Sequence, residues 1–236
     1  MKIALIGYGK MGKAIEKIAI SQEHEIVAII DQTDAVEQLA QVDLDVAIEF
    51  TQPDSAYKNL YYCVSNDIPV ISGTTGWLEK REEIESLCRS KNSTFLYASN
   101  FSIGVNLFFE LNEWLSRRIL KLGFNSSITE VHHIEKKDSP SGTAITLAEG
   151  VIKNDPAKTG WVNSKTTDHQ KLAIFSERKP NVPGTHTVSY DAALESIEIK
   201  HTAHDRNVFA EGVVKVAAWI HKRKGVFTMA DFINDN

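Results

Sequence analysis

The segment from Glu130 to Ala144 carries the residue types that proton transfer and anion binding require. His132 and Lys136 are four positions apart, a spacing that places two side chains on one face of a strand or of a helix. Two neighbouring cations disfavour each other's charge, which brings such a pair closer to proton transfer at neutral pH. This pair is therefore a candidate proton donor.

The same segment contains a candidate anion receptor. After Pro140, Ser141 is a natural N-cap for a helix over Gly142–Ile152. Gly142 and Thr143 would then present free N–H groups to an anion such as a substrate carboxylate. A proton donor beside a carboxylate receptor is what reduction of an unsaturated dicarboxylic acid requires.

Three simpler interpretations of this segment stay open. His132 and His133 could bind a metal, but adjacent side chains of a strand point to opposite faces and Glu135 adds no familiar ligand spacing, so no metal site is expected. The run Lys136–Asp138 could be a solvated loop. Ser141–Thr143 could be a helix cap without a ligand.

A GxGxxG turn near the start of the chain follows a strand-length apolar run and opens a helix-length stretch. Its members are Gly7, Tyr8, Gly9, Lys10, Met11 and Gly12. The first glycine permits a tight turn, the second lets the backbone approach a pyrophosphate, and the third allows close packing of helix on strand. The positive end of the following helix would face the phosphates. The motif predicts a dinucleotide cofactor, with a ligand-free turn as the alternative.

Asp31 lies 19 residues beyond Gly12, at the end of the second apolar run, where a carboxylate can accept both ribose hydroxyls. The two residues after it include no arginine. Because a carboxylate repels a 2′-phosphate, NADH is favoured over NADPH as the cofactor. Lys10 or Lys13 could still reach such a phosphate.

Two further loops follow strand-length runs, and the ligand crevice of an open α/β sheet lies at the carboxyl ends of its strands. They are Gly73-Thr74-Thr75-Gly76 and Ala98-Ser99-Asn100-Phe101. Both combine flexible backbone with hydroxyl or amide groups suited to a nicotinamide and its ribose. Ordinary turns use the same residue types, so a role without a ligand stays open.

The elements that would position these residues alternate through the first hundred positions. Apolar runs of strand length cover Lys2–Ile6, Glu25–Ile30, Leu44–Phe50, Ile68–Ser72 and Thr94–Ala98. Stretches of helical periodicity cover Lys10–Ser21, Pro53–Asn66 and Trp77–Lys91. Apolar strands separated by helices form βαβ units. The sequence therefore predicts an α/β fold with a Rossmann-type parallel sheet in a nucleotide domain.

The pattern changes after Asn100. Long helices are expected at Gly104–Lys121 and Asn207–Lys222, and strands at Ser127–Ile134, Lys171–Ser176, Thr185–Ser189 and Ser196–His201. These strands alternate apolar and polar residues, which is typical of a sheet solvated on one face. The sequence predicts an α+β domain with a mixed or antiparallel sheet. Asp155–Lys165, with its proline and glycine, is the expected mobile loop.

Composition narrows the function classes. The chain has 236 residues and a net charge of −5, from 26 Lys+Arg and 31 Asp+Glu, so it offers no basic field for nucleic acid. No apolar run exceeds five residues, and neither a membrane span nor a signal peptide is expected. Cys63 and Cys88 cannot supply a disulfide framework, so a reducing cytoplasm is the expected location. Small-molecule chemistry remains.

At these motifs the sequence resembles the dihydrodipicolinate reductase family, whose enzymes are also called 4-hydroxy-tetrahydrodipicolinate reductases. The family signature E-x-H-H-x-x-K-x-D-x-P-S-G-T-A is present from Glu130 to Ala144. The glycine turn, the Gly73–Gly76 loop, Asn100–Val105 and the segment from Arg206 to Ala210 match as well. The resemblance covers nearly the whole chain.

The resemblance implies hydride transfer from NADH or NADPH to the cyclic product of aspartate semialdehyde and pyruvate, in lysine and diaminopimelate synthesis. It implies that His132 is the general acid and Lys136 a second proton donor or electrostatic partner. Residues implied to hold the substrate carboxylates are His133, Gly142 and Thr143. Residues implied to line the cofactor are Gly7 to Gly12, Asp31, Gly73 to Thr75 and Ala98 to Phe101.

The resemblance also implies a domain plan. Residues 1–101 and 206–236 would bind the dinucleotide, and residues 102–205 would bind the substrate and build a homotetramer by sheet pairing. The glycine turn is one residue shorter than in many members, and residues 178–186 depart from the family's R-x-G-x-I-V-G-E-H pattern. The alternatives are another two-domain nicotinamide-dependent dehydrogenase and a non-catalytic NAD(H)-binding sensor.

Overall fold

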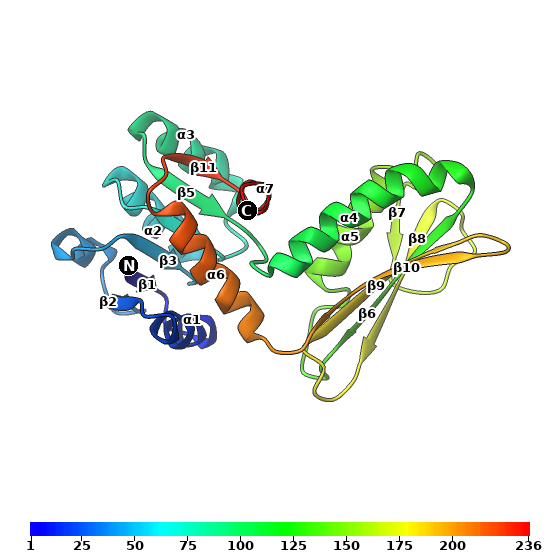
Figure 1. Cartoon of the computed structure of the whole chain (residues 1–236), viewed down its shortest axis with the longest axis horizontal. Helices are drawn as coiled ribbons and strands as arrows, with labels where there is room; N and C mark the ends of the chain where they lie inside the picture. The colour runs from blue at the N-terminus through cyan, green and yellow to red at the C-terminus, as the bar shows by residue number, and fades with distance from the viewer. The chain divides into compact units, whose positions relative to one another are not determined.

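The computed structural model describes every residue of the chain, from Met1 to Asn236. The chain divides into two units (Figure 1). The first unit joins Met1–Ile103 with Asn207–Asn236, and the second is Gly104–Arg206. None of the helices combines the length and the apolar character needed to cross a membrane.

The first unit contains a six-stranded parallel sheet in the order β11-β5-β4-β3-β1-β2. Its strands are β1 (Lys2–Ile6), β2 (Glu25–Ile30), β3 (Val46–Glu49), β4 (Val70–Ser72), β5 (Thr94–Tyr97) and β11 (Gly225–Phe227). Side chains alternate along a strand, so Ile3 and Leu5 pack on one side of the sheet and Ala4 and Ile6 on the other. Both faces are apolar because helices cover both, which confirms the predicted Rossmann-type sheet.

Helices α1, α6 and α7 cover one face of this sheet, and α2 and α3 cover the other. Their bounds are α1 (Lys10–Ser21), α2 (Pro53–Ser65), α3 (Arg81–Lys91), α6 (Asn207–Ile220) and α7 (Met229–Asn234), with 3₁₀ turns at Val36–Gln41 and Leu78–Lys80. Pro53 stands in the first turn of α2, where its missing N–H leaves no hydrogen bond unmade. The doubly covered sheet follows directly from the alternating pattern.

The C-terminal segment returns to the first unit through backbone contact as well as apolar packing. A side chain at Gly212 of α6 would overlap the carbonyl oxygen of Phe101, so the helix can lie against that backbone only because residue 212 is glycine. Beyond α6, β11 pairs in parallel with β5 and adds the edge strand of the sheet. Neither β11 nor α7 was predicted, because β11 has only three residues and α7 only six.

The second unit contains a five-stranded mixed sheet in the order β10-β9-β6-β8-β7. Its strands are β6 (Asn125–His132), β7 (Gly160–Val162), β8 (Lys171–Arg178), β9 (Gly184–Asp191) and β10 (Ser196–Ala203), and its helices are α4 (Ile103–Ile119) and α5 (Gly142–Ile152), with a 3₁₀ turn at Leu120–Leu122. β6 pairs in parallel with β8 and antiparallel with β9. Apolar residues of α4, α5 and one sheet face form a single core. The opposite face of the sheet lies outside this core.

The expected mobile loop over residues 155–165 was wrong in part. Residues Gly160–Val162 form β7, which pairs in parallel with β8. Thr159 also donates its backbone N–H to the carbonyl of Gln170 at 2.8 Å. Three residues are too few for a strand period to stand out, and the nearby Pro156 together with Gly160, the first residue of β7, made the stretch resemble a loop.

Candidate active site

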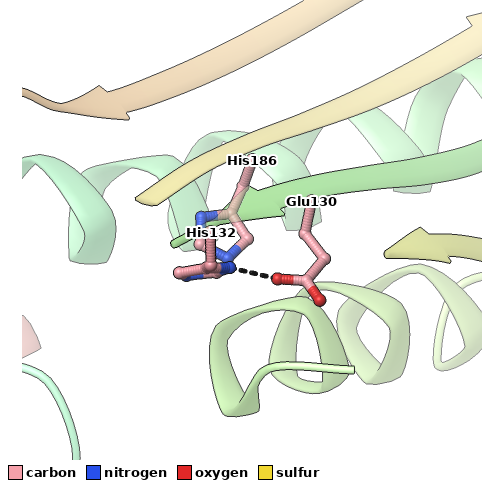
Figure 2. A group of neighbouring side chains, drawn as sticks. All are labelled: Glu130, His132 and His186. Atoms are coloured by element: carbon pink, nitrogen blue, oxygen red, sulfur yellow. Dashed lines mark ion pairs between the residues drawn. The ribbon is translucent and has the colours of Figure 1, made fainter. Parts of the chain in front are cut away.

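Four polar side chains gather on the helix-facing side of the second unit's sheet. Glu130 and His132 lie two positions apart on β6, so both point to the same face. Glu130 is paired with His186 of β9, and His132 with Arg178 of β8. Figure 2 shows Glu130, His132 and His186 converging from β6 and β9. The sheet register brings together residues that lie up to 56 positions apart in the chain.

Glu130 is fully buried, and both of its carboxylate oxygens have partners. Its Oε1 accepts a hydrogen bond from Arg178 Nη1 at 3.0 Å, and its Oε2 forms an ion pair with Nδ1 of His132. Burial alone would raise the pKa of Glu130, but hydrogen bonds from His132, Ser176 and Arg178 outweigh it and lower that pKa to about 2. The carboxylate is therefore ionised at neutral pH.

His186 packs against the ring of His132. The two rings meet edge to face with centroids 5.0 Å apart, and Nε2 of His186 lies 3.0 Å from the hydroxyl of Ser141. Burial, and after it the positive charge of His132, lowers the pKa of His186 to about 3. His186 is therefore neutral at neutral pH, and it links the ring of His132 to the residue that begins α5.

Lys136 lies in the loop that leaves β6, and Arg178 ties this loop to the sheet. Arg178 donates from Nη2 to the carbonyl of Asp138 at 2.6 Å and from Nε to the carbonyl of Lys136 at 3.4 Å. The ammonium of Lys136 is 2.8 Å from the carboxylate of Asp138. Burial raises the pKa of Asp138, but the hydrogen bond from Lys136 outweighs it and the pKa is lowered. The loop is thus tied to the sheet by the half-buried Arg178 and is more than a solvated charge run.

His133 points away from this cluster, and both of its ring nitrogens have partners. Nδ1 lies 2.9 Å from the carboxylate of Glu135, and Nε2 contacts the guanidinium of Arg206. The side chain of His133 is one-fifth exposed. A substrate carboxylate would therefore meet His133 and Arg206 together.

The N-terminus of α5 has the predicted cap. The hydroxyl of Ser141 accepts a hydrogen bond from the N–H of Ala144 at 3.2 Å, which confirms Ser141 as the N-cap. A Cβ added at Gly142 would meet nothing within 4 Å, so packing within the chain does not require a glycine there. Thr143 is half-buried beside it. The open space at Gly142 fits an approaching anion.

Glu130, His132 and His186 also have the donor types of a metal site, with ligand atoms within 4.8 Å of one another (Figure 2). Among the possible metal ligands considered from the sequence, His132 was included and His186 was not. The Glu130 carboxylate is already engaged by His132, and the adjacent Arg178 charge opposes a cation. The geometry is that of a histidine ion-paired with a buried carboxylate.

The first unit contains a cleft of about 320 Å³ around the glycine turn. Its lining includes Gly7, Tyr8, Gly9, Asp31, Asp34, Thr51 and Lys58. Gly7 has φ +94°, and a side chain there would overlap the carbonyl of Phe50. A Cβ at Gly9 would meet nothing within 4 Å, so this glycine leaves space that the protein itself does not fill. The cleft therefore fits the pyrophosphate and ribose of a dinucleotide.

The remaining residues of the glycine turn begin α1. Gly9 is the N-cap, and no side chain accepts the first N–H groups of the helix, which begins with Lys10 and Met11. A side chain at Gly12 would overlap the carbonyl of Gly7, so helix and turn pack as closely as the motif predicts. Lys10 is exposed and does not line the cleft.

Two carboxylates, Asp31 and Asp34, occupy the end of β2 that borders the cleft. The carboxylate of Asp34 accepts the backbone N–H of Asp31 at 2.9 Å. The only cation in the cleft lining is Lys58, which lies 3.4 Å from Glu37. No arginine lines the cleft.

The two other loops do not line the cleft, but they lie at the carboxyl ends of β4 and β5. Thr74 is buried, Thr75 is exposed, and Gly73 packs against the ring of Phe50 so closely that a side chain there would overlap it. Ala98 donates its N–H to the carbonyl of Ser72 at 3.1 Å, and Phe101 packs on Phe50 with ring centroids 5.8 Å apart. Ser99 is exposed, and the amide oxygen of Asn100 accepts the backbone N–H of Ser102 at 2.9 Å.

A fully buried glutamate, which sequence reasoning missed, connects the strand ends beside the cleft. Glu49, the last residue of β3, accepts hydrogen bonds from Ser72 at 2.6 Å, from Thr74 at 2.9 Å and from the backbone N–H of Thr51 at 2.9 Å. Burial raises the pKa of Glu49 despite these donors. In the sequence, Glu49 stands out as an acidic residue within an apolar strand, but that pattern does not identify its hydrogen-bond partners.

A parallel sheet with a glycine turn, an acidic cleft at the end of β2, and a second unit with an ion-paired histidine define a nicotinamide-dependent oxidoreductase of two units. Two family models match the chain: the N-terminus of dihydrodipicolinate reductase over residues 1–101 and its C-terminus over residues 104–233. The chain belongs to the dihydrodipicolinate reductase family. The resemblance seen in the sequence is confirmed.

Named relatives support the same family. The 4-hydroxy-tetrahydrodipicolinate reductase of Christiangramia forsetii is 44% identical over 236 residues, covering 100% of this chain and 98% of that protein. The enzyme of the same name from Thermosipho africanus is 34% identical over 238 residues, covering 100% and 99%. The similarity thus extends over both units.

Solved structures show the same fold. A dipicolinate-bound dihydrodipicolinate reductase from Paenisporosarcina sp. TG-14 superposes with a TM-score of 0.83 at 22% identity, covering 97% of each chain. A probable dehydrogenase from Thermotoga maritima gives a TM-score of 0.56 at 9% identity, covering 99% of this chain and 93% of the other. The fold is therefore shared with other dehydrogenases.

The ion-paired state of Glu130 predicts a pH-dependent contribution to stability. A lowered pKa in the folded state stabilises the protein above the unfolded value of 4.5, and this contribution is lost as the pH falls towards 2. It amounts to about 3 kcal/mol. The difference in unfolding free energy between wild type and Glu130→Gln should therefore shrink by about that amount between pH 4.5 and pH 2.

Urea unfolding at a series of pH values measures this difference. Glu177→Gln is the matched control, because Glu177 lies on the same strand as Arg178 with its carboxylate exposed beside Lys179. Its difference from wild type should stay nearly constant. A constant difference for Glu130→Gln as well would contradict the ion pair.

Proposed function

We propose that this protein reduces 4-hydroxy-tetrahydrodipicolinate to tetrahydrodipicolinate in lysine and diaminopimelate biosynthesis, with loss of the 4-hydroxyl as water. The observation that carries this proposal is the link from the ionised Glu130, through His132 and His186, to Ser141 at the start of α5. A proton donor and a receptor for a carboxylate are thereby held together. Membership of the family supports the same reaction.

His132 would act as the general acid. When bound, a nicotinamide would supply the hydride, which would add to the conjugated ring formed once the 4-hydroxyl and a hydrogen of the neighbouring ring carbon have left as water. Negative charge would then build towards the ring nitrogen. His132 delivers the proton that must follow, with Glu130 against its Nδ1. Lys136, placed by the Arg178-anchored loop, would stabilise the developing charge or donate a second proton.

The substrate is a dicarboxylate, and two groups would receive its carboxylates. Gly142 and Thr143 would offer the free N–H groups at the start of α5. His133, together with the Arg206 that contacts it, would hold the other carboxylate. His132, His133, Gly142 and Thr143 all lie within residues 102–205, so we assign substrate binding to that segment. Arg206, the last residue of the same unit, borders it.

Residues 1–101 and 206–236 would form the dinucleotide-binding domain. Gly7, Gly9 and the start of α1 would hold the pyrophosphate, and Asp31 would bind the adenosine ribose. The loops Gly73–Thr75 and Ala98–Phe101, at the neighbouring strand ends, would hold the nicotinamide and its ribose. Because Asp31 and Asp34 both border the cleft, NADH is the preferred cofactor.

Steady-state kinetics with both cofactors test the reaction and the preference together. NADH oxidation should depend on freshly condensed aspartate semialdehyde and pyruvate, with kcat/KM for NADH roughly tenfold above that for NADPH. Asp31→Ser should narrow this ratio, because it removes the charge that repels a 2′-phosphate. Oxidation with another amino-acid or sugar substrate instead would favour a different dehydrogenase. Cofactor binding without turnover would favour a sensor.

Substitutions of the two proton-transfer residues test their roles. His132→Gln and Lys136→Ala should each lower kcat by about 10²–10⁴-fold, the usual contribution of a positioned acid. NADH affinity, measured by fluorescence titration, should be unchanged because neither residue lines the cleft in the first unit. Lys179→Ala, which removes an exposed neighbouring cation, is the control. Wild-type kcat in either variant would exclude the role assigned to that residue.

We place the enzyme in the cytoplasm. Cys63 and Cys88 are both free and buried. Burial raises the pKa of Cys88 to about 11 and raises that of Cys63 as well, so neither thiol is an active nucleophile. Two inert unpaired thiols fit a reducing compartment.

We propose a homotetramer assembled through the sheet of the second unit. Strand β10 is an edge strand of eight residues, and the sheet face opposite the helices carries half-buried Thr129, Val131 and Thr187. Light scattering coupled to gel filtration should give four times the mass of one chain. Thr187→Arg, which places a charge at the centre of this face, should reduce that mass. A wild-type monomer would contradict the assembly.

A further inference from the structure

We propose that Glu130 is a positioning residue that keeps a proton on Nδ1 of His132 and thereby makes Nε2 the nitrogen that transfers the proton to substrate. This inference rests on the proposed function of His132. It gives Glu130, the first residue of the signature, a role that the proposed reaction does not specify. The contacts around the His132 ring carry it.

The two nitrogens of His132 lie in different surroundings. Nδ1 is buried against Oε2 of Glu130, and an ionised carboxylate can only accept a hydrogen bond. Nε2 has no hydrogen-bond partner within the protein and faces Gly184 at the start of β9. A Cβ at residue 184 would lie 3.1 Å from Nε2, so the glycine keeps this nitrogen uncrowded. The carboxylate therefore selects the tautomer with the proton on Nδ1.

Glu130 can do this only if its carboxylate stays ionised and in place. Arg178 holds Oε1 at 3.0 Å while also donating to the carbonyl of Asp138 at 2.6 Å, so the guanidinium is itself fixed by two groups. Hydrogen bonds to these partners outweigh burial and keep the pKa of Glu130 low. The carboxylate is thus anchored on the side opposite His132.

The remaining groups around the ring do not compete for Nδ1. On β9, His186 is neutral and turns its Nε2 to Ser141. On β10, His201 lies beyond His186, and burial lowers the pKa of His201. In the loop after β6, Lys136 pairs with Asp138. Glu130 is therefore the one carboxylate paired with this ring.

The arrangement suits repeated proton transfer. The carboxylate offsets the charge of the imidazolium that precedes transfer. On transfer, the Nε2–H bond breaks, its electron pair stays on the nitrogen, and the proton bonds to the reduced substrate. The neutral ring keeps its Nδ1–H and the same contact with Glu130. Solvent then returns a proton to Nε2, so no reorientation of the ring is needed between turnovers.

Kinetics of Glu130→Gln form the first test. An amide presents both a donor and an acceptor to Nδ1, so the tautomer is no longer fixed. We expect kcat to fall about 100-fold, with KM for NADH within about twofold of wild type and the alkaline limb of the kcat profile at lower pH. Glu130→Asp, which keeps the charge, should recover part of kcat. The exposed Glu177→Gln should match wild type. Wild-type kcat and pH profile in Glu130→Gln would overturn the proposal.

The tautomer itself can be observed without any catalytic assay or a Glu130 variant. In protein labelled with ¹⁵N-histidine, the ring-nitrogen signals of His132 are those missing in His132→Gln. When the ring is neutral, they should show a protonated Nδ1 and an unprotonated Nε2. The opposite tautomer in wild type would overturn the proposal even if Glu130→Gln does not fold.

The two proposals can fail separately. An Nδ1-protonated ring in a protein that does not turn over the condensed substrate would refute the function and leave the positioning role intact. An active wild type whose His132→Gln variant is inactive, but whose Glu130→Gln variant keeps wild-type kcat, would refute the positioning role alone.

Discussion

The second unit depends on one buried charge, the carboxylate of Glu130. A buried carboxylate without partners is strongly destabilising, and removal of one partner of such a pair typically costs about 3–5 kcal/mol. Glu130 lies on β6, its partner Arg178 lies on β8, and Arg178 also fixes the loop that carries Lys136. The requirement to pair this charge therefore fixes the strand register and the loop of Lys136 together. The arrangement of the candidate site follows from the need to pair the buried carboxylate of Glu130.

The first unit also buries a carboxylate but stabilises it in a different way. Glu49 is as deeply buried as Glu130, but its partners are hydroxyls and a backbone N–H, with no cation. The pKa of Glu49 is raised whereas that of Glu130 is lowered. A glutamate bound by neutral donors joins the strand ends beside the cleft without adding a full ion pair there. A glutamate bound by cations can serve proton transfer instead.

Local patterns revealed the parallel sheet, the glycine turn, and the cap at Ser141, because each depends on residues close together in the chain. The sequence also showed Glu130 beside His132, but not the partners of Glu130. Arg178 and His186 lie 48 and 56 residues further on, at the two ends of the segment that departs from the family pattern. Only strand pairing brings them together, and periodicity cannot specify which strands pair. Strands β7 and β11 escaped prediction because three residues carry no measurable period.

The charges of the site explain how an acidic protein can select a dianion. The chain carries a net charge of −5, and two groups of the site already contact carboxylates of the protein: the ammonium of Lys136 pairs with Asp138, and the ring of His133 contacts Glu135. A substrate carboxylate bound at His133 would therefore replace the contact with Glu135 rather than enter a bare positive field, and the other carboxylate would be received by the N–H groups of Gly142 and Thr143. A ligand with two carboxylates would satisfy both receptors at once, whereas a ligand with one carboxylate would leave either the His133 contact unexchanged or the N–H groups at the start of α5 without an acceptor. Specificity would then come from the spacing of two carboxylates more than from net attraction.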